Sequence, residues 1–269
     1  MCRHVRAEAK NAGCGIIASV ATTKVTVSCG PVISLTAYEE AALSFDHGGH
    51  EYATWQAGEG PNLLFIHGFP TASWDWCRIW GPLSWQFRCH AMDMLGFGLS
   101  AKPAGRKYLI TEQAEAQLAL LKSRGVREVH LLAHDYGDTV AQELFARQIE
   151  ESTDGIAIKS VIFLNGGLFP DLHRPRLIQK LLATPLGPVL SRLLTKRSFE
   201  KNFRDIFGVQ TQPTDQEIDG FWSLLNRHNG RNVMPALLDY MAQRRTHEER
   251  WLQPLISSSV PKRLINGAA

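Results

Sequence analysis

The stretch from Val129 to Leu144 constrains the fold of this chain more than any other. It begins with an apolar run of the kind found in buried strands and continues into a segment with helical spacing of apolar residues. Asp135 lies at the junction, with Ala133 two positions before it and Gly137 two positions after it. A sharp strand-to-helix turn needs small neighbours because its two arms come close together, and this is the geometry of a nucleophile elbow. A buried strand followed by a helix-capping aspartate fits the same residues, so the stretch alone leaves both interpretations open.

Apolar runs of buried-strand type alternate with helical segments over more than half of the chain. The clearest runs are Leu63–Ile66, Phe87–Met92 and Ile158–Leu164, and a hairpin with a glycine-rich turn is expected between Leu43 and Trp55. Near-continuous apolar strands separated by helices indicate a mostly parallel sheet that is covered by helices on both faces. The chain is therefore predicted to belong to the α/β class.

The alternation stops after Leu164, because residues 168–257 have helical patterning throughout. This segment is predicted to be a helical cap inserted between two strands of the sheet. We therefore divide the chain into a poorly ordered N-terminal extension (1–36), an α/β core (37–167), a helical cap (168–257) and the start of a further core strand (258–269).

The composition disfavours several other classes of protein. Of the 269 residues 44% are hydrophobic and 20% are charged, as in globular chains, and the net charge of +3 is too small to indicate a nucleic-acid partner. The basic cluster Arg244, Arg245 and Arg250 is expected on a solvated surface. The five cysteines include no C-x-x-C pair, which argues against a disulfide scaffold and a zinc site. No run approaches the ~18 apolar residues of a membrane span. A cytoplasmic location is expected in preference to secretion or membrane association.

Polar groups follow four of the predicted strands, namely the His67–Pro70 turn, Asp93, Asp135 and Asn165. Ligands of open parallel sheets bind beyond the carboxyl ends of the strands, so these groups are expected to converge at one edge. Their convergence favours the elbow interpretation of Asp135. The backbone amides of Phe69 and Tyr136 can then point at one oxygen, and one such donor contributes about 3 kcal/mol to the stabilisation of an oxyanion.

An aspartate in the elbow predicts attack on carbon through an ester intermediate. The Asp135 carboxylate would attack an sp³ carbon and form an alkyl-enzyme ester. Water must then attack the ester carbonyl, so the oxyanion develops on Asp135 itself, and a general base, normally histidine, must activate that water. None of the ten histidines follows the predicted cap. His134 adjoins the nucleophile but is expected to be a packed, hydrogen-bonded residue, because an elbow presents only its apex to the site.

Three motifs resemble the α/β-hydrolase superfamily. They are His67-Gly68-Phe69-Pro70, the segment Asp93–Ser100, and Ala133-His134-Asp135-Tyr136-Gly137. The motifs are similar to those of the epoxide hydrolase and haloalkane dehalogenase branch, in which the elbow nucleophile is aspartate. Two longer stretches, Leu132–Leu144 and Asn165–Pro175, most closely resemble the group of the mesoderm-specific transcript protein and its bacterial relatives. The resemblance covers about Leu43 to Gly267.

The resemblance implies a role for each matching residue. Asp135 would be the nucleophile, the amides of Phe69 and Tyr136 would form the oxyanion hole, and Tyr240 of the cap would protonate the oxygen of an opening epoxide. The alternative for Tyr240 is a helix-surface residue with a half-buried ring. The remaining residues expected to line the site are His67, Gly68, Pro70, His134 and Asn165. The implied ligand is a small apolar molecule, with no cofactor or metal, bound by a monomer or homodimer.

Departures from the family pattern limit the implied reaction. Dehalogenases usually have tryptophan after the nucleophile and Asn or Glu after His-Gly, where this chain has Tyr136 and Phe69, and both differences disfavour haloalkane chemistry. The family pattern also places an orienting acid and a base histidine beyond Ala269. We therefore expect a C-terminally truncated, epoxide hydrolase-like enzyme that lacks a core strand, the C-terminal helices and the base. The alternatives are a haloalkane dehalogenase-like enzyme and a non-catalytic member that binds a small ligand or a partner protein.

Overall fold

A seven-stranded sheet lies at the centre of the computed structural model, which describes residues 32–171, 176–184 and 186–267. The strand order is β1-β2-β4-β3-β5-β6-β7. The strands are β1 (Leu43–His47), β2 (His50–Ala57), β3 (Asn62–Ile66), β4 (Arg88–Met92), β5 (Glu128–His134), β6 (Ala157–Leu164) and β7 (Lys262–Ile265). The pairs β1–β2 and β2–β4 are antiparallel, and all other neighbours are parallel. The predicted α/β fold with a mostly parallel sheet is therefore confirmed.

The register of β3 against β5 sets the position of the candidate site. Leu64, Phe65 and Ile66 of β3 are fully buried, as expected for a central strand covered on both faces. The parallel register pairs Ile66 with Ala133, so the two strands end at the same level. The turn that follows β3 and the turn that follows β5 are therefore neighbours at the carboxyl edge of the sheet.

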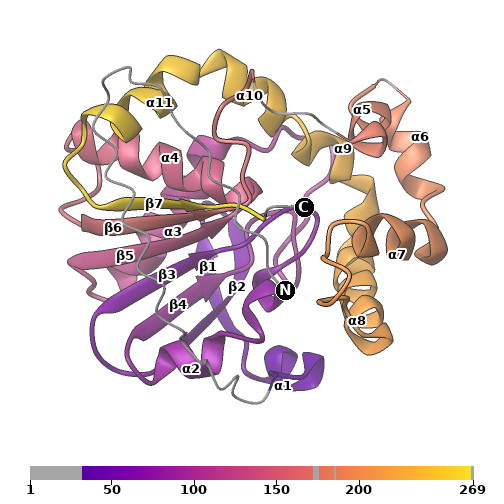
Figure 1. Cartoon of the computed structure of the whole chain (residues 1–269), viewed down its shortest axis with the longest axis horizontal. Helices are drawn as coiled ribbons and strands as arrows, with labels where there is room; N and C mark the ends of the chain where they lie inside the picture. Colours follow the sequence, from indigo (N-terminus) through magenta and orange to yellow (C-terminus); the bar gives the residue numbers. More distant parts are fainter. Residues whose placement is uncertain (1–31, 172–175, 185, 268–269) are drawn as a thin grey trace, which may run out of the picture.

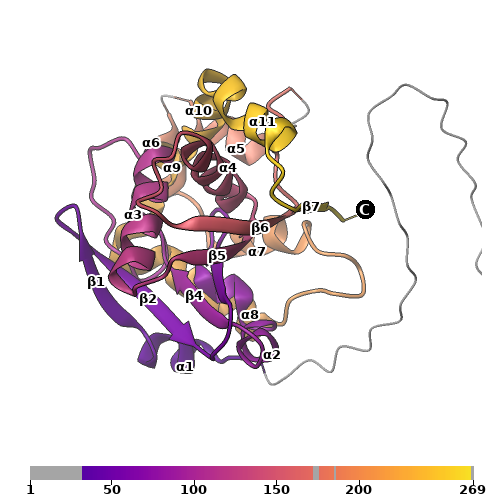
Figure 2. The same cartoon turned by 90° about the vertical axis from the view of Figure 1, so that its left-hand side faces the viewer.

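Helices cover both faces of the sheet (Figures 1 and 2). On one face, α4 (Tyr136–Ile149) packs against β3, β5 and β6, and α3 (Ile110–Ser123) packs beside α4. Val140 and Leu144 lie four residues apart in α4 and are fully buried, which confirms the helical spacing predicted for this segment. The short helices α1 (Leu35–Glu40) and α2 (Trp80–Ser84) and the 3-10 helix η1 (Ser73–Trp76) lie toward the other face.

The core begins before the predicted boundary at residue 37. The Ile33 amide donates a hydrogen bond to the carbonyl oxygen of Cys77 (3.1 Å). The Ser34 hydroxyl accepts one from the Ala37 amide (3.1 Å) and so caps the N-terminus of α1. Residues 32–36 thus belong to the fold because a cap and a backbone bond attach them to it. The expectation for residues 1–31 lies outside the described residues.

The helices that follow β6 form a lobe beside the core, at the right of Figure 1. They are α5 (Leu177–Leu182), α6 (Gly187–Arg192), α7 (Lys196–Arg204), α8 (Asp215–Asn226), the 3-10 helix η2 (Arg227–Asn232) and α9 (Met234–Leu237). We call the segment from α5 to α9 the cap lobe. Thr214 and Glu217 form a capping box at the start of α8, which explains where the longest helix of the lobe begins.

The last two helices, α10 (Tyr240–Thr246) and α11 (Glu248–Ser257), return to the core and pack against α4. The buried Glu143 carboxylate of α4 accepts hydrogen bonds from Trp251 Nε1 (2.8 Å) and Arg250 Nε (3.0 Å) of α11. Arg250, expected on a solvated surface, keeps 32% of its side chain exposed while it pairs with the buried Glu143. The segment expected as one cap, 168–257, divides into the cap lobe and a pair of helices that covers the core.

The strand expected near Val260–Ile265 is β7, which pairs with β6 in parallel. All four of its residues are exposed. Among the described residues, no helix combines the length and the apolar character that crossing a membrane requires.

Candidate active site

Asp135 connects β5 to α4 in a sharp turn. Its φ of 52° and ψ of −104° place a non-glycine residue in a strained conformation, which typically costs about 1–3 kcal/mol. Gly137 permits the turn, because a Cβ atom at this position would lie 2.2 Å from the carbonyl oxygen of Ile66. Ala133, on the other arm, is completely buried. The two small residues therefore have the steric role that the sequence pattern assigned to them.

The turn after β3 lies directly against this elbow. The Phe69 amide donates a hydrogen bond to Asp135 Oδ2 (3.0 Å). A Cβ atom on Gly68 would lie 2.8 Å from His134 Nδ1 and 3.2 Å from Asp135 Cβ, so only glycine fits this close approach. Tyr136 is the first residue of α4, where backbone amides have no carbonyl partner within the helix. Of the two predicted oxyanion-hole amides, that of Phe69 is bonded to the Asp135 carboxylate, and that of Tyr136 follows Asp135 directly in the chain at the start of α4.

His67 belongs to the scaffold of this turn. Its buried ring accepts a hydrogen bond from the Met94 amide at Nε2 (3.0 Å), which leaves the ring proton on Nδ1, 2.9 Å from the carbonyl oxygen of Gly68. The ring therefore joins the turn after β3 to the loop after β4.

Two of the polar residues that follow strands, Asp93 and Asn165, accept hydrogen bonds from backbone amides. The Asp93 carboxylate is completely buried and accepts hydrogen bonds from the Tyr38 hydroxyl and from the amides of Ser73 and Leu99, each at 2.7 Å. Asn165 is exposed, and its Oδ1 accepts a hydrogen bond from the Gly267 amide (2.7 Å). The structure therefore places Asn165 where it joins the ends of β6 and β7, next to Leu164, whose carbonyl oxygen accepts a hydrogen bond from the Asp135 amide (3.1 Å).

His134 lies on the side of the elbow that faces η1. Its Nδ1 is 3.6 Å from Asp75 Oδ2, and Asp75 also accepts hydrogen bonds from the Thr71 hydroxyl (2.7 Å) and the Gly68 amide (3.2 Å). Burial lowers the pKa of His134, but the pairing with Asp75 and the charges of Asp75, Asp135 and Asp138 outweigh it and raise this pKa to about 9. The imidazole is therefore protonated at neutral pH.

The rings of Tyr136 and Tyr240 are in contact beside the elbow, with their centroids 4.9 Å apart and their planes tilted by 53°. Both side chains are completely buried, so the alternative of a half-buried surface tyrosine is wrong for Tyr240. Neither hydroxyl has a hydrogen-bond partner among the described residues. Burial, together with the nearby Asp135 charge, raises the pKa of Tyr240, which keeps this phenol protonated.

Two residues that the sequence did not single out, Asp138 and Arg244, adjoin the elbow. The fully buried Asp138 carboxyl lies one helical turn after Asp135, with no hydrogen-bond partner for Oδ2 among the described residues. Burial raises the pKa of Asp138 to about 8; the Asp135 charge adds to this rise, and the charges of His134 and Arg244 oppose it. A helix-start aspartate is ordinary in sequence, and only the packing reveals this one.

Arg244 corrects the expectation of a solvated basic cluster, because only 2% of this residue is exposed. Its Nε donates a hydrogen bond to Thr139 Oγ1 (2.7 Å), and its Nη2 donates one to the carbonyl oxygen of Asp135 (3.1 Å). The guanidinium also lies 4.6 Å from the centre of the Tyr240 ring. Since α10 packs on α4, this arginine fixes the backbone of Asp135 and the position of Tyr240.

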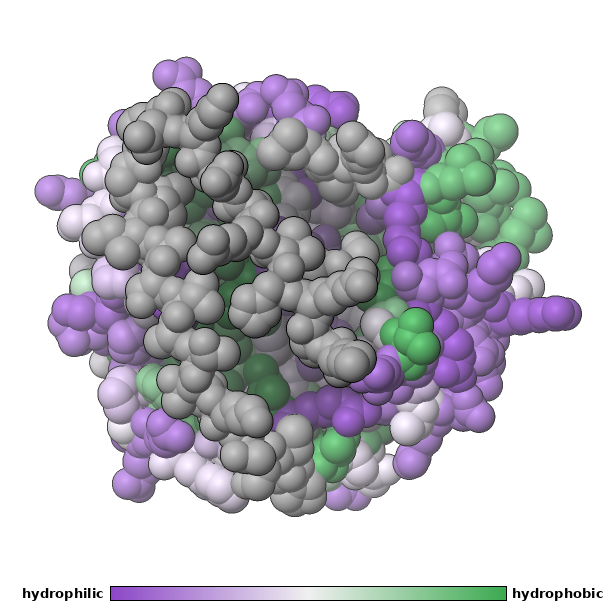
Figure 3. Space-filling model, in the orientation of Figure 1, coloured by the Kyte–Doolittle hydropathy of each residue, from purple (hydrophilic) through white to green (hydrophobic). Residues whose placement is uncertain are grey.

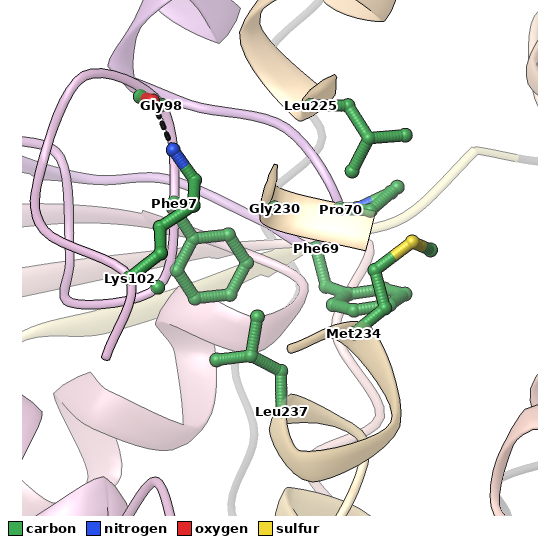
Figure 4. Close-up of a pocket in the computed structure, with 10 residues that line it drawn as sticks. Phe69, Pro70, Phe97, Gly98, Lys102, Leu225, Gly230, Met234 and Leu237 are labelled. Carbon is green, nitrogen blue, oxygen red and sulfur yellow. Dashed lines mark hydrogen bonds between the residues drawn. The ribbon is translucent and has the colours of Figure 1, made fainter. Parts of the chain in front are cut away.

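An apolar cavity lies beside the Phe69 turn at the boundary between core and cap lobe (Figure 4). Its volume is ≈ 210 Å³ with its open mouth included, and most of its lining is apolar: Phe69, Pro70, Gly96, Phe97, Gly98, Lys102, Leu225, Gly230, Met234 and Leu237. Phe69 lines the cavity, and its backbone amide donates the hydrogen bond to Asp135 Oδ2. The ring of Phe97 contacts that of Tyr136, with the ring centroids 5.2 Å apart. The single ionisable residue is Lys102, whose pKa is lowered to about 8 by burial and by Arg227, against the opposing charge of Asp93.

No cluster of three or more His, Cys, Asp or Glu side chains that could hold a metal ion occurs in the part of the chain that the structure describes. Cys77 and Cys89 are buried free thiols. Burial raises the pKa of each thiol to about 12, which makes both unreactive at neutral pH.

Comparisons with known proteins agree with this geometry. Residues 61–183 match the model of a family described as alpha/beta hydrolase fold. The mesoderm-specific transcript protein of Mus musculus is 42% identical over 210 residues, which make up 76% of this chain and 63% of that protein. The putative hydrolase LipZ of Mycobacterium tuberculosis is 34% identical over 194 residues, covering 72% of this chain and 67% of that protein. The chain thus spans less than two thirds of the length of its mesoderm-specific transcript relatives.

The fold also matches solved structures. The haloalkane dehalogenase DatA of Agrobacterium tumefaciens C58 superimposes with a TM-score of 0.70 over 83% of this chain and 77% of that chain, at 21% identity. At this level of identity the likeness concerns the fold alone.

Proposed function

This chain belongs to the α/β-hydrolase fold family, and on that basis we propose that it is an epoxide hydrolase-like enzyme with Asp135 as nucleophile. One observation carries the proposal. Asp135 sits on a strained elbow at the carboxyl edge of the sheet, and its carboxylate accepts one hydrogen bond from the described residues, that of the Phe69 amide. The remaining lone pairs are free to attack a substrate held against Phe69.

In the proposed first step, a carboxylate oxygen of Asp135 attacks a ring carbon of the epoxide. The carbon–oxygen bond of the ring breaks, its electron pair stays on the ring oxygen, and an alkyl ester forms on Asp135. Tyr240 gives its phenolic proton to that oxygen. Its complete burial, its contact with Tyr136 and the absence of a hydrogen-bond partner among the described residues support this role.

The second step is attack of water on the ester carbonyl of Asp135. The negative charge that develops on this oxygen would be held by the amides of Phe69 and Tyr136, which adjoin it. The water must lose a proton to a base. His134 cannot take that proton at neutral pH because its pKa of about 9 keeps it charged. We therefore expect the ester to be long-lived in this chain.

The cavity beside Phe69 supports a small apolar substrate. Its lining is mostly apolar, which is the kind of surface that binds apolar ligands. A haloalkane would need a donor for the leaving halide next to the nucleophile, and Tyr136 has no indole N–H to provide it. An epoxide hydrolase-like reaction is therefore preferred to a haloalkane dehalogenase-like one.

The test is to incubate the purified chain with 1,2-epoxyhexane and to measure its intact mass, then to map the modified peptide. We expect a stoichiometric adduct on Asp135, absent in Asp135→Asn. In Tyr240→Phe the adduct should form about a hundredfold more slowly, because general acid catalysis is lost. Tyr52→Phe is the matched control, since Tyr52 is also buried but lies in β2.

Three results would count against the proposal. An adduct in Asp135→Asn would exclude Asp135 as the nucleophile, and rapid release of bromide from 1-bromohexane would favour the dehalogenase-like reading. Binding of the epoxide without any adduct would favour a non-catalytic member of the family, which remains the second candidate because His134 cannot act as a base at neutral pH.

A further inference from the structure

The outer surface of the cap lobe exposes large aliphatic side chains. Leu177 and Leu181 of α5 are 73% and 44% exposed, and Leu186, Val189 and Leu193 at α6 are 66%, 56% and 69% exposed. We call these five residues the leucine face. Figure 3 shows a hydrophobic patch at the upper right, where Figure 1 places α5 and α6.

Helical spacing explains why these residues share one side of the lobe. Leu177 and Leu181 lie four positions apart, as do Val189 and Leu193. Leu182 of α5 and Ser191 of α6 are buried instead, and α6 packs inward on η2 and α9. The leucine face is therefore an excess of apolar surface that the packing of the lobe does not use.

The segment of sequence that carries the leucine face has charges of one sign only. Residues 172–199 contain six Lys and Arg residues and no Asp or Glu. The whole chain has a net charge of +3, so without these six positive charges its net charge would be −3. Lys180, Arg192 and Arg197 are exposed and form no ion pair with a described residue. A segment of aliphatic and basic residues is thus set into a chain that is otherwise mildly acidic.

Aliphatic side chains surrounded by Lys and Arg are characteristic of surfaces that lie in the interface of an anionic membrane. A second copy of the chain is a poorer occupant, because a twofold interface would bring the basic residues of both copies together. A partner protein is also a poorer fit, since the centres of such interfaces are enriched in Tyr, Trp and Met, and the leucine face contains none of them.

We propose that the leucine face docks on the surface of an anionic lipid bilayer, with Leu177, Leu181, Leu186, Val189 and Leu193 in the headgroup boundary and Lys180, Arg192 and Arg197 on the lipid phosphates. The docking needs no membrane-spanning helix. It does not depend on the chemistry of Asp135. It would place the cap lobe against the phase in which apolar substrates dissolve.

The test is co-flotation of the whole purified chain with unilamellar vesicles. One set contains phosphatidylcholine alone, and the other contains phosphatidylcholine with about 30 mol% phosphatidylserine, which gives the anionic surface that attracts basic segments. We expect binding to the anionic vesicles that weakens in 0.5 M salt, roughly the concentration at which surface charges are strongly screened. Leu177→Ser/Leu193→Ser and Lys180→Glu/Arg192→Glu should each reduce the partition coefficient at least about tenfold.

Matched controls separate docking from general stickiness. Trp85→Ser/Ile256→Ser removes two exposed apolar residues outside the cap lobe (74% and 85% exposed), and Lys107→Glu/Arg263→Glu makes the same change in net charge elsewhere. Both should bind like the unmodified chain, and circular dichroism melting should show all variants folded. Equal losses in controls and test variants, or no binding of the unmodified chain to anionic vesicles, would overturn the proposal. So would a dimer in analytical ultracentrifugation that the Leu177→Ser/Leu193→Ser change abolishes.

Discussion

Two aspartates follow parallel strands on either side of β3 and have opposite environments. Asp93 ends β4 and Asp135 ends β5, with only β3 between them in the sheet. The Asp93 carboxylate is completely buried and accepts three strong hydrogen bonds of 2.7 Å from separate donors. The Asp135 carboxylate is partly accessible and accepts one, at 3.0 Å, from the described residues.

The comparison shows that a strand-end position brings a carboxylate to the edge of the sheet but does not decide its role. The saturated carboxylate holds loops, because both of its oxygens accept hydrogen bonds from donors in separate parts of the chain. The unsaturated one retains lone pairs for a substrate. The two residues also differ in backbone strain, because Asp135 has a positive φ and Asp93 does not.

Replacing each aspartate by asparagine, which has the same shape but no charge, should give the largest difference between the two positions in the free energy of unfolding. Asp93→Asn puts an amide N–H₂ against existing donors and should lower the free energy of unfolding by about 3 kcal/mol. Asp135→Asn should change it by less than about 1 kcal/mol, because a single hydrogen bond is involved. Urea denaturation of both variants measures the difference. Equal destabilisation of the two would show that saturation does not separate them.

The sequence predicts the sheet and the elbow because both are encoded locally. Apolar runs mark β3, β4, β5 and β6, and the small residues Ala133 and Gly137 mark the turn. It does not reveal that the Asp93 carboxylate is saturated with hydrogen bonds, because the donors come from residues as far as 55 positions away. For the same reason Arg244 was predicted to be solvated, although it bonds Thr139 from 105 positions away. Contacts of this kind follow from packing, which no local pattern contains.

A second test extends the comparison to Asp138, a carboxyl that is as buried as Asp93 but lacks its donors. Its pKa of about 8 in the folded state lies above the 3.8 of an unperturbed group, so the folded state binds the proton more tightly. This contribution to stability is fully present below pH 4 or so and is lost as the pH rises through 8.

The stability of the Asp138→Asn variant relative to the unmodified chain should therefore increase with pH. The difference in free energy of unfolding between the two proteins should be on the order of 2 kcal/mol more favourable to the variant at pH 9 than at pH 5. Thermal melting across this pH range measures the difference, and Asp93→Asn serves as the control that should lose stability at both ends. Parallel pH profiles for the Asp138→Asn variant and the unmodified chain would mean that Asp138 is not a buried, unsatisfied carboxyl.

The smallest effect is expected at His134, the group that balances the negative charges around the elbow. Its pKa is raised from 6.5 to about 9 by Asp75, Asp135 and Asp138 against the effect of burial. Its stabilising contribution is thus fully present below pH 6.5 and is lost as the pH rises through 9. Because 32% of the His134 side chain is exposed, solvent screens its interaction with the carboxylates. We therefore expect its charge to contribute about 1 kcal/mol to the free energy of unfolding.

His134→Gln should accordingly destabilise the protein at pH 6 and have little effect at pH 10. Asp75→Asn tests the cause, since it removes the closest carboxylate and should shift the loss of stability toward lower pH. Equal destabilisation by His134→Gln at pH 6 and at pH 10 would show that the charge of the imidazolium does not contribute to stability.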